Sequence, residues 1–457
     1  MTRNSAIGVQ CGADCRRNGK TEMAPATRRG TGLEQTDSAL KAFLHDFARR
    51  KEGDKNVELG SKRRIFRVLG MTVACLLGTV SARSQIGPSG GQSVFSGQSR
   101  PAGQAIPAVK PLMSDEFFKN VQVLKGIPVD QFMGTMGFIA ASLSVNCTEC
   151  HVSEDYSKDT ELKVKAREMM LMVKTLNQAN FGGAHRVTCY TCHRSDTSPR
   201  STPSLAEQYG TPPDRDPNDI EFVEQPDPNQ LTADQLLDKY IQALGGPARL
   251  ASLTSLSAKG TYAGFDTDLE KVPAEFYLKF PGLSTSIAHR SDKAENITTY
   301  DGHSAWVGMS NTRLPLKSLT GGELDVARLD AEIFFPAGIK QYLRNWRVGF
   351  PLTTVDDQEV QVVQAIAPGG TQVKLFFATK TGLLVRTARF ANTALGLNPS
   401  QVDYSDYREV AGVKVPFHWT LSWTDGRSDF DMTDVQPNVP IDASKFGEAV
   451  LPKPATP

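Results

Sequence analysis

Cysteine is scarce in this chain, which contains 7 cysteines among 457 residues. Three of them, Cys11, Cys15 and Cys75, lie near the N-terminus, so that only four remain if this part is removed. Long apolar runs are also lacking, because residues 65–80 are short for a membrane span and include Arg67. The formal net charge of +1 argues against nucleic acid or an anionic membrane surface as the main partner. The composition, 39% hydrophobic and 22% charged, is typical of a soluble globular protein with about two or three domains.

The four remaining cysteines form two copies of the pattern Cys-x-x-Cys-His. The two copies are Cys147, Cys150 and His151, then Cys189, Cys192 and His193. This is the attachment signature of a c-type haem, because two thiols on one helical turn reach the two vinyl groups of the porphyrin. The adjacent histidine then becomes the proximal ligand of the iron. Zinc is the main rival, but zinc does not require a histidine directly after each second cysteine. The sequence therefore predicts two covalently bound haem c groups and a protein that moves electrons.

Methionines precede both motifs and are candidates for the sixth iron ligand. Met133 and Met136 come before the first motif, and Met169, Met170 and Met172 come before the second. Residues three apart share a helical face, which groups Met133 with Met136 and Met169 with Met172. Methionine is also a common core residue, but five of the 11 methionines fall in these two segments. We expect one ligand from each segment. The alternative is a haem peroxidase or oxidoreductase with one open iron, so enzymatic activity stays undecided, with a non-enzymatic electron carrier favoured.

The N-terminal part indicates export. Residues 1–60 are polar and basic without apolar periodicity, and we interpret them as a disordered extension or an incorrect start. Residues 61–82 combine basic residues, an apolar run and a small-residue cleavage site, which is typical of a signal peptide. Residues 83–113 are rich in Gly, Ser, Gln and Pro and predict a flexible linker. We therefore expect a periplasmic protein. Its signal peptide is either removed or kept as an anchor on the outer face of the inner membrane.

The rest of the chain predicts a multidomain protein, with a small all-α dihaem domain over residues 114–195 and an α+β domain over residues 231–448. In the first, helices are expected from Ser114 or Asp115 through Leu124, over 132–143 with Asp130 as cap, and over 160–176. The prolines of residues 196–230 predict an extended linker. Residues 449–457 are expected to be a disordered tail.

Residues 231–448 open with a helix that starts within residues 231–234, carries apolar residues from Leu236 to Leu244 on one face and stops at residues 245–246. The rest alternates with period two. The clearest strand is 413–423, and a Lys380-Thr381-Gly382 turn indicates a hairpin. The pattern predicts a curved, mostly antiparallel sheet of about seven to eleven strands with one or two helices against it.

The order of methionine helix, turn and Cys-x-x-Cys-His resembles the tetrahaem cytochrome subunit of photosynthetic reaction centres. The segments that match are 120–124, 132–151, 166–169 and 187–194. The resemblance implies Met136 as the sixth ligand of the first haem and Met169 as that of the second. This chain has two motifs instead of four, so it is similar to half of that subunit, and photosynthesis is not implied. His185 lies near the place of a histidine that ligates a further haem in the family, but we interpret it as a surface or second-shell residue.

The C-terminal part, residues 231–446, is similar to periplasmic lipoprotein-carrier half-barrels. The similar segments are 240–246, 380–386 and 404–416. The resemblance implies an apolar concavity for a hydrophobic or lipid ligand, and a docking or spacing domain is the alternative. His289, His303 and His418 are scattered without metal-ligand spacing. Redox partner proteins are expected in either case, and a lipid or lipoprotein carrier with redox-sensing haems remains a further hypothesis.

Overall fold

The computed structural model describes residues 110–210, 216–219, 230–290, 294–334, 336–348 and 353–451. All of these residues belong to one compact unit of the chain. The predicted N-terminal extension, the signal segment, nearly all of the first linker and most of the tail lie outside the described residues. Within the described part, no helix combines the length and the hydropathy needed to cross a bilayer.

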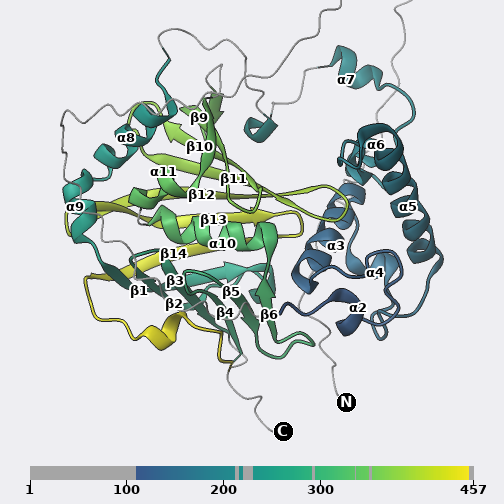
Figure 1. Cartoon of the computed structure of the whole chain (residues 1–457), viewed down its shortest axis with the longest axis horizontal. Coiled ribbons are helices and arrows are strands. Elements are labelled where there is room, and N and C mark those ends of the chain that lie inside the picture. The colour runs from purple at the N-terminus through teal and green to yellow at the C-terminus, as the bar shows by residue number, and fades with distance from the viewer. Residues whose placement is uncertain are drawn as a thin grey trace, which may run out of the picture. The chain divides into compact units, whose positions relative to one another are not determined.

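The residues that carry both Cys-x-x-Cys-His motifs fold into a set of helices, which we call the helical region (residues 110–210; Figure 1). In chain order these are α2 (Ser114–Phe117), α3 (Val129–Leu143), α4 (Cys147–Cys150), α5 (Glu161–Phe181), α6 (Cys189–His193) and α7 (Leu205–Tyr209). Each motif forms a helical turn of its own, and a long helix, α3 or α5, precedes it.

Side chains next to the helix ends explain where the long helices begin. Helix α5 starts after Thr160, whose Oγ1 accepts a hydrogen bond from the backbone N–H of Lys163 at 3.2 Å, and it ends at Gly182 in the left-handed conformation. It begins as predicted and runs further than residue 176. Helix α3 was predicted to start after Asp130, but it starts after Pro128. Asp130 therefore lies inside its first turn and is not its cap.

The first predicted helix is wrong in length, because α2 ends at Phe117 and does not continue to Leu124. The chain turns at Asn120, whose backbone has a φ of 60°. The Asn120 side chain holds this turn by donating hydrogen bonds to the Ser157 carbonyl and to Asp159 Oδ1, both at 2.7 Å. These partners lie far along the chain, so local periodicity could not reveal the break.

The C-terminal part, which we call the β-rich region (residues 230–451), is built on one continuous sheet. The strands are β1 (Ser255–Gly264), β2 (Val272–Lys279), β3 (Leu283–His289), β4 (Glu295–Tyr300), β5 (Ala305–Met309), β6 (Leu316–Leu319), β7 (Arg344–Val348), β8 (Thr353–Val355), β9 (Gln358–Ile366), β10 (Gln372–Ala378), β11 (Leu384–Asn392), β12 (Leu397–Val410), β13 (Val413–Trp423) and β14 (Gly426–Pro437). They pair antiparallel in the order β6-β5-β4-β3-β2-β1-β14-β13-β12-β11-β10-β9-β7, with β8 on β9. The expected curved antiparallel sheet is confirmed. Its 14 strands exceed the predicted number, and strands as short as β6 and β8 do not display an alternating pattern.

Four helices pack against this sheet and form its main core (Figure 1). They are α8 (Ala233–Ala243), α9 (Pro247–Ser252), α10 (Gly321–Ile333) and α11 (Ile339–Tyr342). The predicted helix is α8, where Thr232 caps the N-terminus and Leu236, Leu237 and Tyr240 are each 2% exposed. Buried side chains of all four helices join those of the strands in one cluster, so the chain's own residues occupy this face of the sheet.

Short elements occupy the described part of the predicted proline-rich linker. Helix α7 falls within it, and a 3-10 turn covers Pro217–Asp219. The Asn218 side chain donates a hydrogen bond to Gln401 Oε1 on β12 at 2.9 Å. The Asn218 carbonyl also accepts a hydrogen bond from Lys374 Nζ on β10, and the turn contacts β8. This segment therefore touches the sheet at several strands.

Candidate haem sites

Each motif is held as a single helical turn by the residue that precedes it. Asn146 Oδ1 accepts a hydrogen bond from the backbone N–H of Thr148 at 2.9 Å at the start of α4. At the start of α6, the backbone N–H of Thr188 donates to Thr191 Oγ1 at 3.0 Å. Residues three apart on such a turn share a face, so both cysteines of a motif are presented to the same side. The four cysteines of the motifs form no disulfide in the described part of the chain: Cys147, Cys150, Cys189 and Cys192.

The two histidines have the same hydrogen-bond arrangement. Nδ1 of His151 lies 3.1 Å from the Tyr156 carbonyl oxygen, and Nδ1 of His193 lies 3.0 Å from the Asp196 carbonyl oxygen. A carbonyl only accepts, so Nδ1 must carry the hydrogen and Nε2 keeps the lone pair. Metal-binding histidines characteristically donate their second nitrogen in this way. Both imidazoles therefore fit an iron ligated through Nε2.

The surroundings of the first motif favour neutral ligands. Burial lowers the pKa of His151, and the charges of Lys163 and Arg167 lower it further, against an opposing effect of the hydrogen bond to Tyr156. The Tyr156 ring stacks on the imidazole with a centroid distance of 4.9 Å. The imidazole is thus held neutral and oriented, which is the form that binds iron.

Burial acts on the thiols as well. It raises the pKa of Cys150, to which the charge of Glu149 adds, and it raises the pKa of Cys189. A raised pKa keeps a thiol protonated at neutral pH and unreactive toward disulfide exchange.

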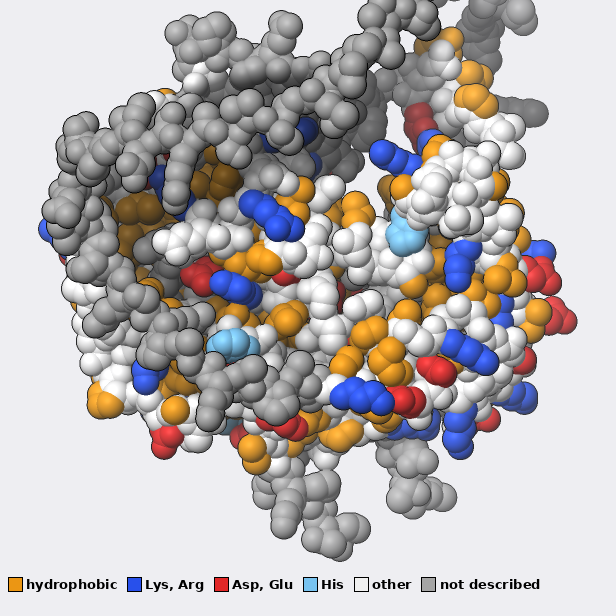
Figure 2. Space-filling view, in the orientation of Figure 1, with side chains coloured by type: hydrophobic (Ala, Val, Ile, Leu, Met, Phe, Trp, Pro, Cys, Tyr) orange, Lys and Arg blue, Asp and Glu red, His pale blue; other side chains and the backbone are white. Residues whose placement is uncertain are grey.

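The methionines differ in their exposure. Met133, Met136 and Met169 are half-buried, Met170 is buried and Met172 is exposed. On α5, Met169 and Met172 share one face with the exposed side chains Leu162 and Leu176. Figure 2 shows hydrophobic side chains gathered at the surface over the helical region. An exposed apolar stripe of this kind fits the flat face of a porphyrin.

Each motif packs against the helix that precedes the other motif, and the second motif also contacts α5, the helix that precedes it. Helix α3 packs against α6, and α4 packs against α5. Met136 accordingly lies in the same hydrophobic cluster as Cys189 of the second motif, whereas the resemblance assigned Met136 to the first haem. The assignment of Met136 and Met169 stays a prediction. His185 is exposed, as a surface residue would be.

Histidines of the β-rich region pair with carboxylates. His289 Nδ1 lies 3.1 Å from Glu295 Oε1, and His418 Nδ1 lies 2.7 Å from Asp431 Oδ1. Among the residues that the structure describes, no group of three or more His, Cys, Asp or Glu gathers as a cation site.

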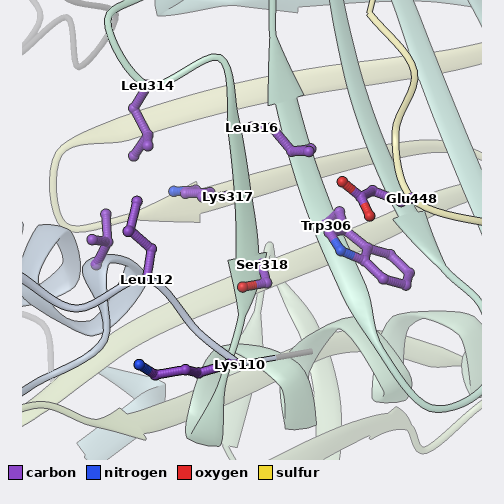
Figure 3. A pocket seen from close by; sticks show the side chains of 9 residues that line it. Lys110, Leu112, Trp306, Leu314, Leu316, Lys317, Ser318 and Glu448 are labelled. Carbon is purple, nitrogen blue, oxygen red and sulfur yellow. The ribbon is translucent and has the colours of Figure 1, made fainter. Parts of the chain in front are cut away.

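A small pocket lies where the segment before α2 meets β5 and β6. Figure 3 shows Leu112 and Trp306 on the two sides of β6, with Lys317 pointing from that strand. The pocket has a volume of about 140 Å³, whereas ligand pockets usually measure about 300–1,000 Å³. It is therefore too small for an acyl chain or a similar ligand.

Comparison with known proteins supports the haem interpretation. Residues 85–213 match the family model described as the photosynthetic reaction centre cytochrome C subunit. The haem-motif region resembles this family. A curated relative from Thermochromatium tepidum, a photosynthetic reaction center cytochrome c subunit, is 33% identical over 120 residues, which is 24% of this chain and 29% of the relative. The subunit of the same name from Rubrivivax gelatinosus is 33% identical over 92 residues, 19% of this chain and 25% of the relative. The chain thus spans less than a third of these relatives, and the resemblance predicted from the motifs is confirmed.

Solved structures that are similar to part of this chain were also found. A LolA superfamily protein from Nitrosomonas europaea matches with a TM-score of 0.33 and 13% identity, over 48% of this chain and 99% of that protein.

Sequence reasoning missed one set of residues beside the second motif, the β11–β12 turn at residues 393–396. Its Leu395 is buried among side chains of the helical region. A signal was present, because the Ala394-Leu395-Gly396-Leu397 stretch is apolar where hairpin turns are usually polar.

Proposed function

We propose that this chain is an exported dihaem c-type cytochrome that transfers electrons. One haem is attached to Cys147 and Cys150, and the other to Cys189 and Cys192. The observation that carries the proposal is the repeated arrangement of two cysteines on one helical turn, followed by a histidine whose Nδ1 donates to a backbone carbonyl. The match to a cytochrome c family over the same residues supports it.

The residues of the helical region have separable roles in this proposal. A bound haem supplies the one-electron redox chemistry. The thiols anchor the porphyrin, and His151 and His193 provide the proximal nitrogens. Met136 and Met169 provide the sixth ligands, with Met133 and Met172 as the alternatives on the same helical faces. Thioether ligation favours the reduced iron and therefore raises its potential.

The β-rich region is proposed to dock and position the cytochrome in the periplasm, where it meets redox partner proteins. The helices α8–α11 support this role, because their side chains fill the main cluster on the sheet. A hydrophobic or lipid ligand remains the second proposal for this region, and the half-barrel resemblance motivates it. We propose residues 114–195 and 231–448 as the two domains, with 196–230 as their connection.

The decisive test is haem stoichiometry. The mature protein, produced in a host that attaches c-type haem, should retain the mass of two haems after denaturation. Cys189→Ala combined with Cys192→Ala should leave one haem, and the matched pair Cys147→Ala with Cys150→Ala should leave the other. Stoichiometric zinc in place of covalent haem would contradict the proposal.

A further inference from the structure

The core of the helical region contains a side chain from the β-rich region. The turn between β11 and β12, residues 393–396, which we call the hairpin tip, reaches the helices (Figure 1). Its Leu395 is 1% exposed and forms one buried cluster with Leu124, Phe138 and Met170. Half-buried members of the same cluster include a candidate ligand and a haem-motif thiol, Met136 and Cys189.

The backbone of the hairpin tip approaches the second motif closely. A Cβ atom built at Gly396 would lie 2.8 Å from Cζ of Phe138 and 3.1 Å from Cγ2 of Thr188, the residue before Cys189. Only glycine avoids this overlap. Thr393 fixes the shape of the tip, because its Oγ1 donates to the Gly396 carbonyl at 2.9 Å and accepts from the Gly396 N–H at 3.2 Å. The tip is therefore a rigid surface.

Helix α3 makes two further contacts with the β-rich region. A Cβ atom at Gly137 would lie 3.1 Å from the Asp425 carboxyl and from Thr424 Oγ1, in the turn between β13 and β14. At the start of α3, Asp130 Oδ2 accepts hydrogen bonds from the Thr320 N–H at 2.6 Å and from Thr320 Oγ1 at 2.9 Å. The helix that carries Met136 is thus held along its length by the sheet and its turns.

From these contacts we infer that the hairpin tip is a positioning element of the second haem site, with Leu395 as its central residue. The inference rests on the proposed function. Leu395 excludes water from the side of the cluster that holds Met136 and Cys189. An apolar, water-excluded surrounding disfavours the extra positive charge of ferric iron, so it raises the reduction potential. The β-rich region thereby raises the potential of the haem attached to Cys189 and Cys192.

The test is a redox titration of full-length holoprotein variants. Leu395→Ala should lower the midpoint potential of the haem attached to Cys189 and Cys192, and Leu395→Val should produce a smaller shift in the same direction. Leu395→Met conserves the side-chain volume, so this variant should keep the midpoint potential of the unaltered protein. The matched control is Leu397→Ala, two residues along the same hairpin at a side chain that is 38% exposed. It should change neither potential.

Haem content is measured in the same samples so that two failures can be told apart. If the unaltered protein carries no covalent haem, the proposed function fails. If Leu395→Ala carries two haems and both potentials stay unchanged, only the role of the hairpin tip is overturned. If Leu395→Ala does not fold, the Leu395→Val titration decides, and an unchanged pair of potentials there overturns the inference equally.

Discussion

The helical region and the β-rich region obtain their cores in different ways. The β-rich region buries a large cluster drawn from its own strands and from α8–α11. The cluster of the helical region has four fully buried members, and one of them, Leu395, comes from the other region. Helix α5 meanwhile exposes apolar side chains such as Leu162 and Leu176. A small helical unit of this kind cannot bury enough apolar surface alone, so it depends on a bound group and on its neighbour, whereas the sheet does not.

Loss of haem attachment should produce the largest contrast between the regions. Replacing all four motif cysteines by alanine removes the group that would cover the apolar face of α5. We expect the amides of α3 and α5 to exchange hydrogen rapidly while those of β10–β13 stay protected. Hydrogen exchange with mass spectrometry measures both regions in one sample. Equal protection of α5 with and without the cysteines would show that the helical region has a sufficient core.

A core substitution in the β-rich region should destabilise that region and not the helical region. Phe377 is 2% exposed and its ring lies 5.3 Å from that of Tyr240. Phe377→Ala should lower the free energy of unfolding of this region by about 3–5 kcal/mol, and denaturant unfolding of the holoprotein measures it. Phe280→Ala is the control, because Phe280 is 54% exposed and should cost much less. A loss below about 1 kcal/mol at Phe377 would mean that the cluster can collapse around the gap.

The sixth ligands can be identified without unfolding either region. Methionine sulfur bound to ferric haem gives a weak charge-transfer band at the red end of the spectrum. Met136→Ala and Met169→Ala should each remove about half of this band and lower one midpoint potential, since methionine ligation raises it. The matched controls are Met133→Ala and Met172→Ala. Loss of the band in one of these variants would assign the sixth ligand to that methionine instead.

The pH dependence of the contact between the regions should be the smallest effect. Burial raises the pKa of Asp130 and of Asp425 above the usual 3.8, against hydrogen bonds and a Lys317 charge that lower it. A carboxyl whose pKa is higher in the folded state contributes stability that is present below the unfolded pKa and is lost as the pH rises through the raised value. Thermal unfolding between about pH 3 and 7 should show this loss, and it should be smaller in Asp425→Asn. If the pH dependence of thermal unfolding is the same in Asp425→Asn as in the unaltered protein, ionisation of Asp425 does not destabilise the fold.

Local patterns predicted several elements because their causes are local. Thr232 caps α8 through a residue three positions away. The 413–423 alternation gives β13, and the Lys380-Thr381-Gly382 turn joins β10 to β11. The two motifs likewise lie within single helical turns.

Elements that depend on contacts with residues far away in the sequence could not be predicted from local patterns. The end of α2 is set by contacts from Asn120 to Ser157 and Asp159. Leu395 is buried because a helix far from it in sequence happens to pack there. The choice among Met133, Met136, Met169 and Met172 also stays a prediction, because helical periodicity defines a face and not the metal that lies over it.

The position of Leu395 in the chain has a consequence for the order of synthesis. Both Cys-x-x-Cys-His motifs leave the ribosome well before residue 395 does. Contacts between residues so distant in sequence form late, because a long loop must close first. The thiols of both motifs are therefore synthesised as part of a loosely packed segment, and the arrival of the hairpin tip completes the core of the helical region afterwards. If haem is attached as proposed, attachment can precede the completion of this core.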